Sequence, residues 1–414
     1  MAHLKRSIGI SLWFMFLTLP LMVVRVNTIN NEVEWRWSNM LWVGLCSFAL
    51  AWLWHFSTER RANRREADKA VAQPAVEKVT FAQRLADDPV LSKRLLLVAA
   101  VIGLVFPWLV STGTNFYHVN VMVSALIFVV LGLGLNITVG LAGLLDLGYI
   151  AFFAVGSYTY ALLSKNFDLG FWTCLPLGGL MGMLFGIVLG FPILRLRGDY
   201  LAIVTLGFAS ITKIVLENWD TVFGGAAGIA NIPRPELFGM ALDGRQKAVY
   251  SYYIVLALVG ITILVTTRLK NSRIGRAWMA LREDEIACVA MGVDMARTKL
   301  SAYALRAFWA GLVGLIFAAH NNFINPDSFT FMDSAMILAM VVLGGMGSIL
   351  GVIIASLALK LLPEYLRTFA EYRMLVFGAV MVLMMIFRPQ GLISNMRRKY
   401  DLSAVKKGKT DGSK

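Results

Sequence analysis

The stretch from Leu95 to Leu145 carries no acidic or basic side chain, His118 aside. Several uncharged runs of this kind exceed the roughly 18 residues expected for a membrane-spanning helix. The polar break from Ser111 to Asn115 divides this stretch into two such helices. Because every backbone group inside a bilayer must be hydrogen-bonded within the protein, we expect these runs to be helical.

Uncharged apolar runs recur along the whole chain. They lie near residues 8–24, 39–56, 95–111, 119–141, 147–163, 171–194, 200–217, 250–267, 299–319, 334–359 and 374–387. Of the 414 residues, 58% are hydrophobic and 15% are charged, against about 45–50% and about 25% in soluble domains. This excludes a soluble enzyme, a disordered tail and a fibrous protein, and the alternating segments of a membrane β-barrel are absent. We predict an all-α polytopic membrane protein with about ten transmembrane helices, some of them broken or re-entrant.

The pattern predicts four parts. Residues 1–56 form a two-helix extension, 57–94 a basic cytoplasmic linker, 95–392 the transmembrane core and 393–414 a basic cytoplasmic tail. The extension begins like a signal peptide, with basic residues before an apolar run. However, that run continues through Val24-Arg25-Val26 rather than ending at small residues, so we interpret it as a retained span.

The formal net charge of +14 is a topology signal. Basic residues gather in 57–94, in 268–299 and in the tail, all of which face the cytoplasm if the N-terminus does. Loops 111–118 and 320–332 carry no Lys or Arg. We therefore predict a multi-pass membrane protein with both termini cytoplasmic, and no nucleic-acid partner.

Eleven single crossings would leave the basic tail on the wrong side, so one run must be re-entrant or broken. The run 334–359 is the first candidate, because Gly344, Gly345 and Gly347 interrupt it. The run 200–217, which carries Lys213 and Glu217, is the second.

Glycines at four-residue spacing form a ridge on one span. They are Gly178, Gly182, Gly186 and Gly190. Small residues let helices approach closely in a membrane. We predict tight packing there, and a smooth face of this kind also permits small sliding motions; Gly344, Gly345 and Gly347 are further hinge candidates.

Charges within or beside the spans are functional candidates. Asp146 lies at a break between spans, where it is either the N-cap of the next helix or, together with Gly143 and Gly148, part of a translocation path. Lys213 and Glu217, four residues apart, are expected to pair with each other. Arg306 is expected to extend to the cytoplasmic surface.

Neither a metal site nor catalytic chemistry is indicated. Cys46, Cys174 and Cys288 are far apart, the four histidines are scattered, and no catalytic constellation falls in the spans. Gly408-Lys409-Thr410 resembles the end of a phosphate-binding loop, but Ser403 replaces its first Gly and no strand precedes it. We expect a chain that is not an enzyme and binds no cofactor.

The loop between the spans 250–267 and 299–319 predicts a short helix. Apolar side chains at Ile274, Ala277, Trp278 and Leu281 follow helical spacing, and Gly292 is a suitable stop. Such a helix suits docking into a partner, or it lies on the lipid headgroups.

Five segments carry a resemblance to a known family. They are GLNITVGLAGLLDLGYIAFFAVGSYTYALL (134–163), LRLRGDYLAIVTLGF (194–208), LREDEIACVAMGV (281–293), MVVLGGMGSILG (340–351) and FRPQGL (387–392). They resemble the branched-chain amino acid permeases of ATP-binding-cassette (ABC) importers. The segment 285–292 also resembles the coupling loop of ABC permeases, although Ile286 replaces an Ala and Gly292 is one place late.

The resemblance implies a transmembrane subunit that imports leucine, isoleucine or valine across a bacterial inner membrane. It implies a second, related permease, two cytoplasmic ATPases that hydrolyse the ATP, and a periplasmic binding protein. Arg276, Glu285, Ala287 and Gly292 would lie in the loop that docks into an ATPase. Two alternatives stay open: a permease of the same superfamily for a sugar or another amino acid, and an ion-coupled secondary transporter.

The segment 218–249 is the longest expected outside loop. Its Gly and Pro residues mark it as rich in turns. We hypothesise that it meets the binding protein.

Overall fold

The computed structural model describes residues 89–110, 117–194, 196, 198–235, 244–365 and 391–393, with two short strands and isolated positions elsewhere. The chain divides into two units, 1–78 and 79–414. In the first unit, strand β1 (Val24–Asn27) pairs antiparallel with β2 (Glu32–Trp35). The basic tail, most of the linker and most of the span 374–387 lie outside the described residues, as does much of the N-terminal extension.

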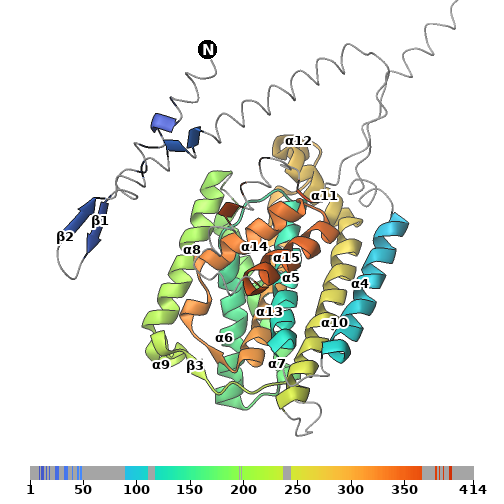
Figure 1. Cartoon of the computed structure of the whole chain (residues 1–414). Helices are drawn as coiled ribbons and strands as arrows, with labels where there is room; N and C mark the ends of the chain where they lie inside the picture. Colours follow the sequence, from blue (N-terminus) through green and yellow to red (C-terminus); the bar gives the residue numbers. More distant parts are fainter. Residues whose placement is uncertain are drawn as a thin grey trace, which may run out of the picture. The chain divides into compact units, whose positions relative to one another are not determined.

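The second unit is a bundle of helices (Figure 1). Its long helices are α4 (Pro89–Val110), α5 (Tyr117–Leu135), α6 (Tyr149–Phe167), α7 (Phe171–Ile193), α8 (Asp199–Asn218), α10 (Gly244–Lys270), α13 (Met295–Asn321), α14 (Phe331–Gly344) and α15 (Ile349–Tyr365). Shorter elements join them: the π-helix η1 (Asn136–Leu141), α9 (Asp220–Phe223), η2 (Gly225–Ala227), β3 (Ile229–Ala230), α11 (Arg273–Glu283), α12 (Glu285–Ala290), β4 (Phe323–Ile324) and η3 (Pro326–Ser328).

The prediction of a helical membrane protein is confirmed. Within the described residues, six helical segments are long and apolar enough to cross a membrane: 117–141, 171–192, 200–218, 244–270, 295–321 and 326–344. The break predicted in the run 334–359 is also present, because α14 ends at Gly344 and α15 begins at Ile349. The second candidate, 200–217, is one continuous helix, α8.

Two helices form the centre of the bundle. The apolar windows of α5 with η1 and of α13 are each 83% buried, whereas that of α8 is 22% buried. Small residues make the central position of α13 possible: Ala307, Ala310, Gly311 and Gly314 are buried along it. Helix α13 packs most extensively against α7 and α6 (Figure 1).

The glycine ridge of α7 lies against α13. A Cβ atom on Gly182 would lie 2.5 Å from the carbonyl oxygen of Ala307, and one on Gly186 would lie 2.5 Å from the Cβ of Ala307. Helix α6 approaches as closely, since Ser157 donates a hydrogen bond of 2.8 Å to the carbonyl of Gly314. Backbone-to-backbone packing of this kind holds three helices together without bulky side chains.

The ends of several helices are tied together at the end of the bundle opposite α11 and α12 (Figure 1). Strand β3 pairs antiparallel with β4, with Ile229 opposite Ile324. Tyr160 donates to the carbonyl of Pro233 (2.8 Å), and the amide of Asn322 donates to the carbonyl of Ile232 (2.9 Å). These bonds fix the loop that follows α9 against the end of α13.

Candidate functional site: the α11–α12 loop and the helix breaks beneath it

The loop predicted to dock into a partner folds as two short helices rather than one. Ser272 caps α11 by accepting a hydrogen bond from the backbone N–H of Gly275 (3.2 Å). Asp284 then interrupts the helix and caps α12, accepting from the N–H groups of Ile286 (2.8 Å) and Ala287 (3.1 Å). Gly292 follows α12 with φ of +80°, a conformation that favours glycine.

One face of α11 is anchored to the bundle. Trp278 and Leu281 are buried, and the indole N–H of Trp278 donates to the carbonyl of Thr298 at 3.0 Å. Helix α12, in contrast, exposes large apolar side chains: Ile286 is 72%, Val289 53% and Met291 84% exposed. We call Ile286, Val289 and Met291 the α12 apolar patch. The loop is therefore rigid on one side and presents an apolar surface on the other.

The predicted coupling residues divide between these two sides. Ala287 and Gly292 are exposed, and so is Arg276, whose guanidinium donates to the carbonyl of Asn271 at 3.1 Å. Glu285 instead faces the bundle, where it forms an ion pair of 2.7 Å with Lys299. The pair links α12 to α13, and Lys299 is only 2% exposed, so removing Glu285 would leave its charge buried without this partner.

Arg282 joins the loop to the membrane part of the bundle. Its Nη1 donates to the carbonyl oxygen of Gly140, in the π-helix η1, at 2.6 Å. The carbonyl of Gly347, between α14 and α15, accepts from Lys270 Nζ at 3.1 Å. The N–H of Gly347 donates to Asn136 Oδ1 at 2.8 Å, which links the two helix breaks to each other.

The first break comprises η1 and the irregular segment 142–148. Gly143 has φ of +73°, and a Cβ there would lie 2.6 Å from the Cγ of Arg282. At the far end, the N–H of Leu147 donates to the hydroxyl of Thr205 on α8 at 3.1 Å. Gly148 approaches the backbone of Thr205 so closely that a Cβ would collide with its carbonyl. The segment is thus held between α11 and α8.

Asp146 forms an ion pair with Arg306, and both side chains are fully buried. The other carboxylate oxygen of Asp146 accepts from the N–H of Gly148 at 3.0 Å. The guanidinium of Arg306 also lies over aromatic rings, at 4.3 Å from the ring centre of Tyr303 and 4.9 Å from that of Phe152. A buried charge needs such a partner, because its desolvation is costly.

The N-cap alternative for Asp146 and the surface position expected for Arg306 were therefore wrong. The residue that caps α6 is Gly148, not Asp146. Arg306 does not extend to the surface, because Asp146 provides its counter-ion in the interior. The expected Lys213–Glu217 pair is confirmed at 3.2 Å, and Lys213 also contacts Asp327 at 3.0 Å.

The second break, between α14 and α15, is rich in glycines, which allow the ends of the two helices to approach each other closely. Gly345 and Gly347 have φ of +104° and +84°. Gly344 approaches Gly351 so closely that a Cβ on Gly344 would lie 2.6 Å from the backbone N–H nitrogen of Val352. The segment 391–393 runs beside it, with the N–H of Leu392 donating to the carbonyl of Leu343 at 2.8 Å.

Sequence reasoning missed four residues that connect these parts. They are Asn136, Lys270, Arg282 and Lys299. Each looked like an ordinary polar residue near a helix end. The partners of Asn136, Lys270 and Arg282 are backbone groups far along the chain, and Lys299 pairs with a side chain of the preceding helix α12. Only the combination of a polar residue with a nearby glycine-rich break could have pointed to them.

The described residues contain no group of three or more His, Cys, Asp or Glu side chains placed to hold a metal ion. Cys174 and Cys288 are buried and free.

Comparisons with known proteins decide the family. Residues 117–385 match the model of the "Branched-chain amino acid transport system / permease component" family. The LivM permease protein of the high-affinity branched-chain amino acid transport system of Escherichia coli is 43% identical over 90% of this chain and 88% of its own length. This chain belongs to the branched-chain amino acid permease family.

Two further permease proteins are more distant relatives. The LivH permease protein of Escherichia coli is 24% identical over 64% of this chain and 91% of its own. The ribose import permease protein RbsC of the same organism is 25% identical over 70% of this chain and 90% of its own. No solved structure matches this chain. Both helix breaks and the α11–α12 loop fall within the range matched to the family.

Proposed function

We propose that this chain is a transmembrane subunit of an ABC importer that moves leucine, isoleucine and valine across the bacterial inner membrane. The observation that carries the proposal is a pair of bonds to the two helix breaks: Arg282 of α11 binds Gly140, and Lys270, at the end of α10 just before α11, binds Gly347. Motion imposed on the loop would reach the membrane part of the bundle through these bonds. The 43% identity to a branched-chain amino acid permease protein supports the substrate class.

Partners follow from this role. A second, related permease would complete the membrane part, and two cytoplasmic ATPases would bind and hydrolyse the ATP. A periplasmic protein would deliver the amino acid. Both termini and the α11–α12 loop would then face the cytoplasm, as the basic residues near α11 favour.

In this scheme the α12 apolar patch docks into one ATPase. Exposed apolar side chains at the tip of a loop are costly in water, and an apolar groove on a partner would cover them. Glu285 and Lys299 would hold α12 in place from behind. Closing of the ATPases on ATP would push α11 and rock the bundle, the general logic of alternating access.

Sugar import is the nearest alternative, because a ribose permease protein is 25% identical to this chain. The higher identity to LivM favours amino acids. An ion-coupled transporter would not need a docking loop.

The test is uptake into proteoliposomes that hold this chain, its related permease and the ATPases, with ATP inside. The binding protein and labelled leucine are outside. We expect uptake that requires ATP and is blocked by unlabelled valine but not by ribose. Entry of ribose instead of leucine would show that the transporter class is right and the assigned substrate is wrong. Uptake driven by an ion gradient without ATP would overturn the proposal.

A further inference from the structure

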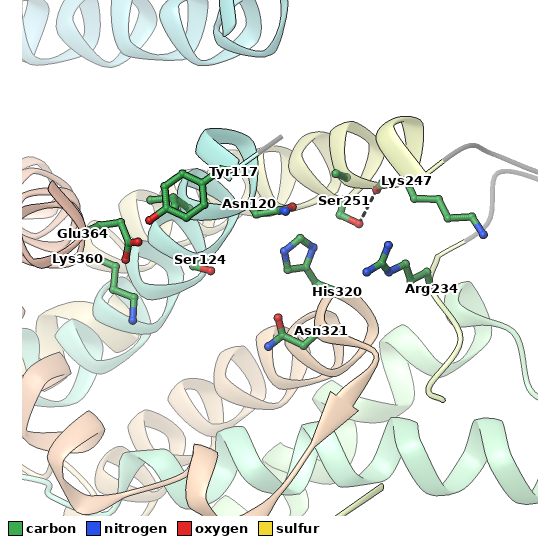
Figure 2. A pocket seen from close by; sticks show the side chains of 13 residues that line it. Tyr117, Asn120, Ser124, Arg234, Lys247, Ser251, His320, Asn321, Lys360 and Glu364 are labelled. Carbon is green, nitrogen blue, oxygen red and sulfur yellow. Dashed lines mark hydrogen bonds between the residues drawn. The ribbon is translucent and has the colours of Figure 1, made fainter. Parts of the chain in front are cut away.

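A polar cavity opens at the end of the bundle opposite α11 and α12. Its volume is about 530 Å³, and it lies among the ends of α5, α10, α13 and α15 (Figure 2). Arg234, Lys247 and Lys360 contribute three cationic side chains to its lining, and Glu364 contributes one carboxylate. The candidate site described above lies at the other end of these helices, so this cavity is separate from it.

The basic residues at this end of the bundle are unexpected, because the distribution of Lys and Arg along the chain assigns this end to the outer side. Loops on the outer side of a membrane protein are expected to carry few basic residues. Here Arg234, Lys247 and Lys360 nevertheless converge on one cavity from a loop and two helices. Basic residues on the outer side weaken the charge difference that orients the protein in the membrane. Their presence here therefore favours a role in binding a ligand over a role in setting the topology.

Two of these cations are held in place by neighbours. Arg234 donates through Nε to the side-chain oxygen of Asn322, directly after α13. Lys360 lies over the ring of Phe128, with its Nζ 3.8 Å from the ring centre. The cationic lining is therefore positioned by its surroundings before any ligand arrives, which lowers the cost of binding.

Neutral polar groups fill the space between the charges. Figure 2 shows Asn120, Ser124 and His320 around the open centre of the cavity. Among the residues that the structure describes, no hydrogen bond reaches the side chains of these three residues. Polar side chains within a folded protein are usually satisfied by protein or water, so these offer donors and acceptors to a small polar ligand.

The charges are arranged at two sides. Figure 2 shows Glu364 with Lys360 on one side of the cavity, and Arg234 with Lys247 on the other. Val121 and Ala248 supply apolar surface to the same lining. Resting on the proposed function, we propose that this cavity is a binding site for a free amino acid, whose α-carboxylate is held at the side of Arg234, Lys247 and His320. Its ammonium group would face Glu364 and the neutral amides and hydroxyls.

This site would receive the amino acid within this chain alone, before it passes between the two permeases. Binding there should be weak, because an amino acid on its way through must also leave. A carboxylate held by Arg and Lys through charge-assisted hydrogen bonds gives specificity against amides and amines of the same shape.

Cysteine accessibility in the reconstituted complex, without binding protein or ATP, tests the site without relying on transport. Ser124→Cys places a thiol in the lining, and Asn166→Cys, at the exposed end of α6 between Lys165 and Asp168, is the matched control. Cys46, Cys174 and Cys288 are replaced by alanine in both. We expect an anionic methanethiosulfonate to label the first thiol faster than a cationic one, with no such preference at the second.

L-Leucine should slow labelling at Ser124→Cys, and leucinamide, which lacks the carboxylate, should not. Adding Arg234→Gln and Lys247→Gln should weaken protection by about tenfold or more, as the loss of charge-assisted hydrogen bonds predicts. Lys213→Gln, a lysine paired with Glu217 and Asp327 outside the cavity, should leave protection unchanged. Equal protection by leucinamide, or protection that survives the double substitution, would overturn the proposal.

Measuring leucine import as well distinguishes a failure of the cavity proposal from a failure of the proposed function. If the wild-type complex imports leucine but leucine never protects Ser124→Cys, the cavity proposal fails and the proposed function stands. If leucine is not imported at all, the proposed function fails, whatever the cavity binds.

Discussion

Arg282 of α11 donates a hydrogen bond of 2.6 Å to the carbonyl of Gly140, a residue more than one hundred positions earlier in the chain. Gly140 lies in a π-helix, so its carbonyl is not part of a regular α-helical ladder. Such segments are frequent at functional sites. A single side chain thus connects the surface loop with an irregular, buried part of the core.

Breaking the buried ion pair should destabilise the bundle. Asp146→Asn leaves Arg306 charged and buried, and losing one partner of a buried pair costs about 3–5 kcal/mol. Replacing both residues, as Asp146→Asn with Arg306→Met, should cost clearly less than the sum of the single changes. Thermal unfolding in detergent measures all three variants, and strictly additive losses would contradict the pairing.

Overpacking the glycine ridge should also destabilise the protein. Gly186→Leu forces a side chain against Ala307 and Tyr303, with an expected cost of about 1–3 kcal/mol or more. Gly260→Leu on α10 is the control, because nothing lies within 4 Å of the Cβ it would carry. Unfolding temperature and yield are compared, and equal values for the two variants would mean that the ridge does not pack as described.

The α12 apolar patch should be needed for docking. Met291→Asp places a charge on a side chain that is 84% exposed, so the fold should survive while the ATPases are lost on co-purification. Arg297→Gln, at a position with a side chain 89% exposed and away from the patch, is the control. Retention of the ATPases by Met291→Asp would show that they bind elsewhere.

Glu285→Arg should uncouple transport by loosening α12. The substitution sets two positive charges against each other, because Lys299 is buried behind Glu285. We expect a folded protein that supports no ATP-driven uptake. The milder Glu285→Gln should keep part of the activity, since its amide oxygen still accepts from Lys299. Full uptake by Glu285→Arg would show that Glu285 has no role in coupling the ATPases to transport.

The sequence predicted what depends on local pattern. Gly344, Gly345 and Gly347 interrupt an apolar run, and the helix breaks there. The α7 glycines predicted a close helix contact, and α13 provides it. Charge partners could not be predicted in this way. Arg306 lies in an apolar span, and only the fold places Asp146, 160 positions earlier, beside it.

The α11–α12 loop shows the same limit. The helical spacing of Trp278 and Leu281 predicted a helix, but not the cap at Asp284 that divides it. Arg282 belongs to the same helical pattern, and nothing local distinguishes it from the exposed Arg276. Its role depends on where η1 lies, which long-range packing determines.

The most direct measurement is the number of leucine molecules imported per ATP hydrolysed by the reconstituted complex, for the wild type and for Arg282→Gln. Arg297→Gln, at a position with a side chain 89% exposed, is the control. If the bond to Gly140 transmits motion, Arg282→Gln should keep hydrolysing ATP while leucine uptake per ATP falls by about tenfold or more, the effect of losing one charge-assisted hydrogen bond. An unchanged ratio in Arg282→Gln would contradict the account.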